Sequence, residues 1–157
     1  MTAIEKALRL PTEKAQILAI GQIVGQKIKG TDQFEYLTAA EKTFIYIDIL
    51  EGAVGTGGFA NFFYNSSGQF ADEILAAYQT IGARHTAALL RSAIRLFPAA
   101  PVPKNLEQRQ DILLAAPSYL DLWDDLDEAF HRCPDPIGAL VIRFVVDHKG
   151  DFGFPLE

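Results

Sequence analysis

Five carboxylates within eight residues are the densest group of side chains in this sequence that could carry chemistry. They are Asp121, Asp124, Asp125, Asp127 and Glu128. Paired carboxylates serve as acid and base in glycosidases and bind hard cations such as Ca²⁺. On a helix, however, four of them would share one face, opposite an apolar face that includes Leu122 and Leu126. The spacing therefore predicts acids that face water, either as a plain solvated face or as a contact surface.

A row of exposed carboxylates can imitate the phosphates of DNA. Acids four residues apart on a helix lie roughly 5–6 Å apart, which is of the same order as the rise of about 3.4 Å per phosphate along a nucleic-acid strand. Glu107 and Asp111 are also four apart and are expected to extend the row across a neighbouring helix, while Trp123 is expected in the core. The predicted partner-binding residues are Glu107, Asp111, Asp121, Asp124, Asp125 and Glu128.

A glycine-rich stretch at residues 55–60 matches the GxGxxA form of a dinucleotide-binding fingerprint. That fingerprint requires a strand that leads into a helix within repeated βαβ units, and no further parallel strands are predicted. We interpret the glycines as a corner between helices. A pocket between Gly57 and Asn65, which would bind a small ligand or house an enzyme's active site, is the alternative.

The histidines and the single cysteine do not form a recognisable metal or catalytic site. His85, His131 and His148 are scattered and lack the HExxH or CxxC spacing that would gather ligands around a metal. Cys133 has no second cysteine with which to form a disulfide, which favours a reducing compartment. We expect no metal, no cofactor and no catalytic residue.

Helical periodicity and capping signals define the elements that must position these side chains. Thr12 precedes a helix predicted over residues 13–29, and Thr38 with Glu41 forms a capping box at the start of the next helix. Residues 44–50 alone resemble a buried strand, but the capping box favours a helix that ends at the glycines of 55–58.

Beyond the glycines, the aromatic run at residues 59–64 predicts a short helical turn. Asn65 tolerates the left-handed conformation, and Ser66 with Gln69 has the form of a second capping box, before a helix over 68–80 that Gly82 breaks. Prolines make an extended connection at 98–104, Ser118 caps a helix, and the tail at 150–157 is expected to dock its aromatic residues. The remaining predicted helices cover residues 83–97, 106–115, 118–132 and 137–148.

Composition is typical of one globular domain over residues 1–157. Hydrophobic residues make up 49% and charged residues 22% of the chain, so a core should form. The predicted class is all-α, a single compact domain of about seven or eight helices. The N-terminus lacks the features of a signal peptide, and no apolar run approaches the ~20 residues of a membrane-spanning helix. We expect a cytoplasmic protein that does not contact membranes.

The net charge of −6 is distributed unevenly along the chain. Residues 1–104 hold nine acidic and ten basic side chains, whereas residues 105–157 hold eleven acidic and four basic ones. Direct binding to nucleic acid relies on Lys and Arg, so this distribution argues against it and favours a basic protein as partner.

Three short motifs resemble the bacterial DNA-mimic protein nineteen family. They are Gly57-Gly58-Phe59, the run from Phe62 to Gly68 and Ile81-Gly82-Ala83. The likeness includes Glu51 upstream and Leu126, Asp127 and Phe130 downstream. The motif residues read as corners and caps around buried aromatics: Gly57, Gly58, Phe59, Asn65, Ser66, Gly68 and Gly82.

The resemblance implies an all-α domain, self-association as a homodimer and, for the member that gives the family its name, an acidic surface that occupies the DNA-binding face of a helix-turn-helix repressor. The resulting hypothesis is a non-enzymatic interaction protein whose acidic C-terminal region binds a basic protein, such as a transcription regulator, in competition with DNA. A ligand-binding protein or enzyme and a structural or immunity-type partner protein remain the alternatives; the latter would show an apolar contact patch in place of an acidic one.

Overall fold

Helices account for all the regular structure in residues 1–30 and 33–153, the part of the chain that this computed structural model describes. This part contains eight α-helices, three short 3₁₀-helices and no strand. The predicted all-α class with seven or eight helices is confirmed. None of the described helices has the length and apolar character required to cross a membrane.

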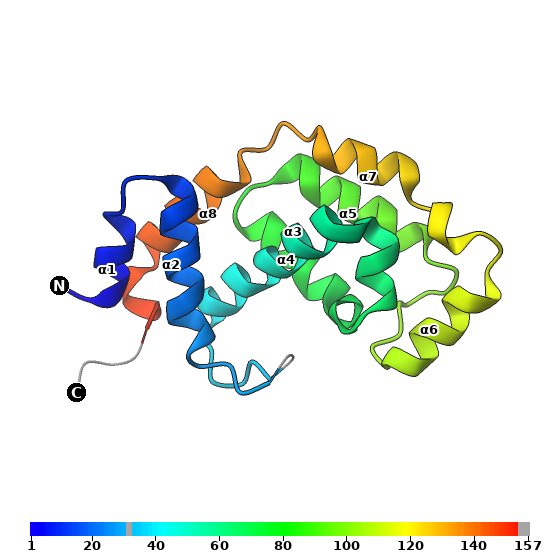
Figure 1. The fold of residues 1–157 in the computed structure, drawn as a ribbon, viewed down its shortest axis with the longest axis horizontal. Helices are drawn as coiled ribbons and strands as arrows, with labels where there is room; N and C mark the ends of the chain where they lie inside the picture. Colours follow the sequence, from blue (N-terminus) through cyan, green and yellow to red (C-terminus); the bar gives the residue numbers. More distant parts are fainter. Residues whose placement is uncertain (31–32, 154–157) are drawn as a thin grey trace. The chain divides into compact units, whose positions relative to one another are not determined.

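The chain forms two compact units, which are described separately (Figure 1). The terminal unit comprises residues 1–45 and 136–157, and the central unit comprises residues 46–135. The terminal unit holds α1 (Ala3–Leu8), α2 (Glu13–Gly25), the start of α3 (Ala39–Tyr64), α8 (Ile137–Asp147) and η3 (Lys149–Asp151). The central unit holds the rest of α3, then η1 (Ser66–Phe70), α4 (Ala71–Thr80), α5 (Arg84–Leu96), α6 (Leu106–Ala115), η2 (Tyr119–Asp121) and α7 (Asp124–His131).

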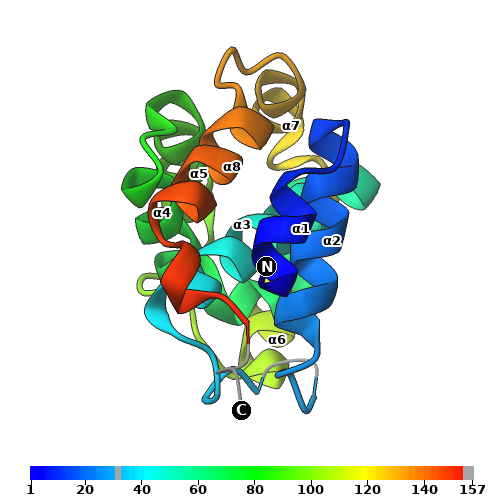
Figure 2. The ribbon, with the colours of Figure 1, turned by 90° about the vertical axis from the view of Figure 1, so that its left-hand side faces the viewer.

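In the terminal unit, α1 and α2 pack side by side (Figure 2). The sequence prediction missed α1, although Thr2 and Glu5 form a capping box at its start. Thr12 caps α2 as predicted, with its hydroxyl accepting a hydrogen bond from the Ala15 N–H at 3.1 Å. The predicted end of α2 at residue 29 is wrong, because hydrogen bonds to the third preceding carbonyl replace the α-helical bonds after Gly25.

Glu41 is the polar centre of the terminal unit. Its side chain is fully buried, accepts a hydrogen bond from the Thr38 N–H and pairs with Lys27 at 2.8 Å, and the Thr38 hydroxyl accepts from the Glu41 N–H. The predicted capping box is therefore confirmed. Glu41 also accepts the Gly153 N–H at 3.2 Å, and Phe152 packs edge-on against Phe44. Phe152 thus docks as expected; Phe154 lies outside the described residues.

In the central unit, α3 bends sharply at the predicted glycine corner. Gly57 and Gly58 leave helical geometry, and Gly58 has a φ of 73° and a ψ of −173°, a combination that is essentially restricted to glycine. The helix then resumes through the aromatic residues up to Tyr64, as predicted. Gly82, also at positive φ, ends α4. The predicted bounds of α5, α6 and α8 agree with the structure to within one residue.

The left-handed conformation expected for Asn65 and the capping box predicted for Ser66 with Gln69 are both wrong. Asn65 is extended, with φ −94° and ψ 177°, and neither side chain caps a helix. The Gln69 side chain instead donates to the Ser66 carbonyl at 3.0 Å, and α4 begins only at Ala71 after a 3₁₀ turn.

The prediction of a single capped helix over residues 118–132 is also wrong. Ser118 has a left-handed conformation with φ 54° and provides no side-chain cap. It leads into η2, and α7 begins at Asp124, where the Asp127 N–H bonds to the Trp123 carbonyl at 2.8 Å. Asp121 and Leu122 therefore lie outside α7, and Leu122 is exposed instead of lying on a buried apolar face.

Candidate partner-binding surface

Asp127 connects α7 to the bend in α3. Its Oδ1 accepts a hydrogen bond from the Phe59 N–H at 2.8 Å, at the point where α3 resumes. A Cβ atom at Gly58 would overlap this carboxylate, so Gly58 is required for both its backbone angles and the space it leaves. Phe59 also packs edge-on against Phe130. The motif residues Gly58 and Phe59 therefore serve to anchor α7, whereas the space beside Gly57 is taken by Asn61 of α3 itself.

This anchoring role of Asp127 was missed in the sequence, where Asp127 was counted among the neighbouring acids and in the downstream part of the family likeness. Burial raises the pKa of the Asp127 carboxyl, while the hydrogen bond from Phe59 acts in the opposite direction. A usable signal was its spacing: Trp123, Asp127 and Phe130 follow one another at i, i+4 and i+7, which places Asp127 on the packed side of α7.

Trp123 fixes the start of α7. Its side chain is 1% exposed and stacks on Phe63 at 4.9 Å between ring centroids. Its indole N–H donates to the Ala93 carbonyl at 2.9 Å, so its polar atom is satisfied inside the core. The expectation that Trp123 belongs to the core is confirmed.

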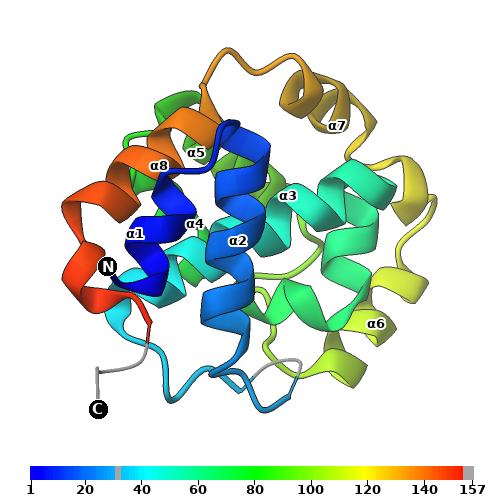
Figure 3. The same ribbon diagram turned by 60° about the vertical axis from the view of Figure 1, so that its left-hand side comes forward.

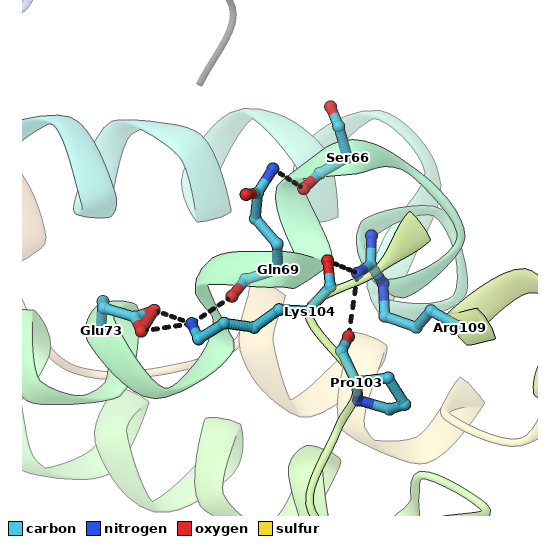
Figure 4. A network of polar contacts seen from close by, with 6 residues as sticks. All are labelled: Ser66, Gln69, Glu73, Pro103, Lys104 and Arg109. Carbon is cyan, nitrogen blue, oxygen red and sulfur yellow. Dashed lines mark hydrogen bonds and ion pairs between the residues drawn. The ribbon is translucent and has the colours of Figure 1, made fainter. Parts of the chain in front are cut away.

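Arg109 lies inside the central unit instead of on its surface, and Figure 4 shows its hydrogen bonds to Pro103 and Lys104. Its fully buried guanidinium donates to four backbone carbonyl groups, and burial lowers the pKa of Arg109. The accepting carbonyls belong to Phe63, Asn65, Pro103 and Lys104. A Cβ atom at Gly68 would overlap the Arg109 side chain, which explains that motif glycine. Nothing in the sequence singled out Arg109, which was counted only among the four basic side chains of residues 105–157.

The acids of η2 and α7 are exposed. Asp121 lies at the end of η2, and Asp124, Asp125 and Glu128 lie on α7. Glu128 pairs with Arg132 one turn further along the helix. Within the described residues Asp121, Asp124 and Asp125 form no ion pair or hydrogen bond through their side chains. Three of the four predicted contact residues on η2 and α7 are therefore exposed and form no ion pair within the described residues.

The acids of α6 lie apart from those of α7. Glu107 and Asp111 are exposed, one helical turn apart, and belong to no ion pair within the described residues. Figures 1 and 3 show α6 and α7 separated, with the yellow η2 segment between them. The structure therefore gathers four of the six predicted residues on η2 and α7, and it places the other two on a separate helix of the same unit.

The acids at the start of α7 also have a structural use. Asp124 and Asp125 occupy the first helical turn, and no side chain caps this helix. Negative charge there interacts favourably with the helix dipole by roughly 0.3–1 kcal/mol per group. A test of partner binding must therefore distinguish the loss of a contact with the partner from a loss of stability of α7.

The partly buried carboxyl group of Glu51 lies elsewhere in the central unit. The Tyr78 hydroxyl donates to Glu51 Oε2 at 2.7 Å. Burial raises the pKa of Glu51, the Tyr78 hydroxyl lowers it, and the nearby Asp48 raises it, with a net upward shift. Glu51 belongs to the sequence likeness described above, and its structural role is this bond between α3 and α4.

Asp135 ties the end of the α7 segment to α5. It accepts hydrogen bonds from the Thr86 N–H at 2.8 Å and from His85 Nδ1 at 2.9 Å. Burial alone would raise the pKa of Asp135, but these bonds outweigh it and lower that pKa. The Thr86 hydroxyl also lies 3.2 Å from Cys133 Sγ. Across the described residues, no three His, Cys, Asp or Glu side chains gather as a metal site requires.

Comparison with known proteins gives one family. The family model described as DMP19-like protein matches residues 35–148. No curated protein matches the chain, and no solved structure does.

Proposed function

Because this chain belongs to the DMP19-like protein family, we propose that it is a non-enzymatic interaction protein that binds a basic DNA-binding protein, such as a helix-turn-helix regulator, through the acidic surface of its central unit. The surface comprises Asp121, Asp124, Asp125 and Glu128, with Glu107 and Asp111 as a second contact on α6. Binding would compete with DNA for the same basic residues.

The distribution of charge between the units carries this proposal. The terminal unit has as many basic as acidic residues, whereas the central unit has twelve acidic and six basic ones. Residues 105–135 alone hold eight acids and two arginines. One of these arginines, Arg109, is buried, and the other, Arg132, pairs with Glu128. The excess negative charge of the chain is thus concentrated on α6, η2 and α7.

The spacing of the acids supports competition with DNA. Asp124 and Glu128 are one turn apart on α7, as are Glu107 and Asp111 on α6, and such pairs are separated by roughly 5–6 Å. Arginine and lysine side chains that contact phosphates can therefore reach carboxylates at similar intervals.

The contacts made by the residues from 57 to 65 favour an interaction protein over a small-ligand binder or enzyme with a pocket in this segment. The Asn61 amide donates to the Ala53 carbonyl at 3.0 Å, and the Asn65 amide donates to the Asn61 carbonyl at 2.8 Å. Phe59, Phe62 and Phe63 are fully buried. The polar groups of this segment are thus used to hold the corner together, which supports a structural role for the motif.

Co-purification from the native cell at low and high salt tests the proposal. We expect the wild-type protein to retain a basic DNA-binding protein that added duplex DNA or high salt releases. The variant with Asp124→Lys and Asp125→Lys should retain it at least about tenfold less.

The control is a variant that removes two exposed acids of the terminal unit, with Glu35→Lys and Asp147→Lys, which should retain the partner as the wild type does. Circular dichroism must show that all the variants remain folded, because the α7 acids also stabilise their helix. Equal retention by the two folded double variants would contradict the proposal.

A further inference from the structure

The acidic surface of the central unit also exposes leucines. Leu114 at the end of α6 is 62% exposed, Leu120 in η2 is 65% exposed and Leu122 is 37% exposed. Their chain neighbours Leu113 and Trp123 are almost completely buried. The fold therefore takes one apolar side chain of each neighbouring pair into its core and leaves the other in water.

The backbone presents these leucines in a fixed arrangement. Ser118 adopts φ 54°, a conformation that non-glycine residues rarely hold without support from surrounding structure. The next residue, Tyr119, stacks on Tyr64 at 6.1 Å between ring centroids. On its other side the segment is anchored by Trp123. A surface held in this way loses little conformational entropy when it binds.

Leucines and carboxylates lie close together in the second half of this stretch. Asp121 lies between Leu120 and Leu122, and Asp124 and Asp125 follow after the buried Trp123. A partner that recognised the acids alone would leave the leucines in water. The matching chemistry is a helix with leucine-like residues on one face and lysine or arginine on its flanks.

From this juxtaposition we infer that residues 114–125, the leucine–aspartate segment, bind the apolar face of a basic amphipathic helix of the partner. The inference rests on the proposed function and specifies it: the leucines contact the apolar face, and Asp121, Asp124 and Asp125 pair with the flanking cations. The acids then account for the salt dependence, and the leucines account for affinity that persists at high salt.

Two synthetic peptides of identical leucine and lysine composition test this inference. In the first the leucines recur at i, i+3, i+4 and i+7, and in the second they are spread around the helix. Fluorescence anisotropy with the full-length protein should show that the first peptide binds at least about tenfold more tightly than the second. Leu120→Ser should weaken binding of the first peptide at least about fivefold, at low and high salt alike.

Leu18 provides a matched control, because it is 63% exposed but lies in the terminal unit. Leu18→Ser should leave binding unchanged.

Equal affinity for both peptides, with loss of binding only on Asp124→Asn or Asp125→Asn, would overturn the amphipathic-helix inference and leave the proposed function standing. If neither the leucine nor the aspartate variants changed binding, both would fall. Self-association in light scattering that Leu120→Ser abolishes would assign the segment to a second copy of the chain and also overturn the inference.

Discussion

Single residues in this protein decide how α3 and α7 are joined. Gly58 combines a positive φ with direct apposition to the Asp127 carboxylate. Gly82 has nearly the same φ, 82°, but has no atom within 4 Å of the position a Cβ would occupy. The two glycines therefore separate the cost of backbone strain from the cost of steric overlap.

We predict that Gly82→Ala lowers the free energy of unfolding by about 1–2 kcal/mol, since only backbone strain is introduced. Gly58→Ala should lower it by at least about 3 kcal/mol, because overlap with Asp127 adds to the strain. Urea unfolding measures both. Asp127→Ala in the Gly58→Ala background should recover part of the loss, and purely additive effects would show that the overlap is unimportant.

The buried carboxyl of Glu51 predicts a dependence of stability on pH. Its pKa is raised above 4.5 in the folded state. Stability from this group is therefore fully present below pH 4.5 and is lost as the pH rises through the folded-state pKa. The Glu51→Gln side chain does not ionise, so the variant avoids this loss of stability. Its amide oxygen can still accept a hydrogen bond from the Tyr78 hydroxyl.

We expect the free energy of unfolding of Glu51→Gln to increase relative to that of the wild type as the pH rises from below 4.5 to neutrality, which means that the variant becomes relatively more stable. Urea unfolding at a series of pH values checks this, with the exposed Glu107→Gln as control. A difference that stayed constant over the whole range would refute the prediction. Comparison with wild type at each pH cancels the contributions of Asp127 and Asp135, which both proteins share.

At the scale of elements, Arg109 of α6 holds three segments together. Its guanidinium bonds to carbonyls at the end of α3, at Asn65 and in the proline-rich connection before α6. The neighbouring Lys104 makes a more exposed contact, an ion pair with Glu73. Figure 4 shows both basic side chains, and the planar guanidinium has more donors in a fixed arrangement than the ammonium has, so it can reach four carbonyls at once.

Arg109→Lys should therefore lower the free energy of unfolding by at least about 2 kcal/mol, because an ammonium cannot reach all four carbonyls and leaves buried acceptors unpaired. Lys104→Ala should cost less than about 1 kcal/mol, as is usual for an exposed ion pair. Thermal unfolding followed by circular dichroism measures both changes. If the two variants lost similar stability, the hydrogen bonds of the Arg109 guanidinium would not be the main contact that joins these segments.

At the scale of the whole molecule, the placement of charge matters more than its total. The two double variants described above, Asp124→Lys with Asp125→Lys and Glu35→Lys with Asp147→Lys, shift the net charge equally but alter different units. A general field effect would slow association equally in both, whereas a local surface would not.

For a purified basic partner, we predict that the association rate falls at least about tenfold for the central-unit variant and less than about threefold for the terminal-unit variant. Stopped-flow measurements at low and high salt would show this difference shrinking as salt screens the charges. Equal reductions at low salt would show that net charge alone governs association.

The sequence by itself determined the features that depend on neighbouring residues. The capping box of Thr38 and Glu41, the apolar periodicity of α5 and the break at Gly82 act within one or two helical turns, so these features could be predicted. The motif residues pointed correctly to a corner at Gly57 and Gly58. The uneven distribution of acids could likewise be read directly from composition.

Packing between distant segments decided which charged groups are buried and which acids lie together. Arg109 is buried and Asp127 partly buried because backbone donors and acceptors from distant segments satisfy them. Helical spacing could place Asp127 on the packed side of α7, but it could not identify these partners. The same long-range packing set the start of α7 through Trp123, which excluded Asp121 from that helix. It also placed the acids of α6 apart from those of α7, because a helix face defines neighbours within one helix and not between two.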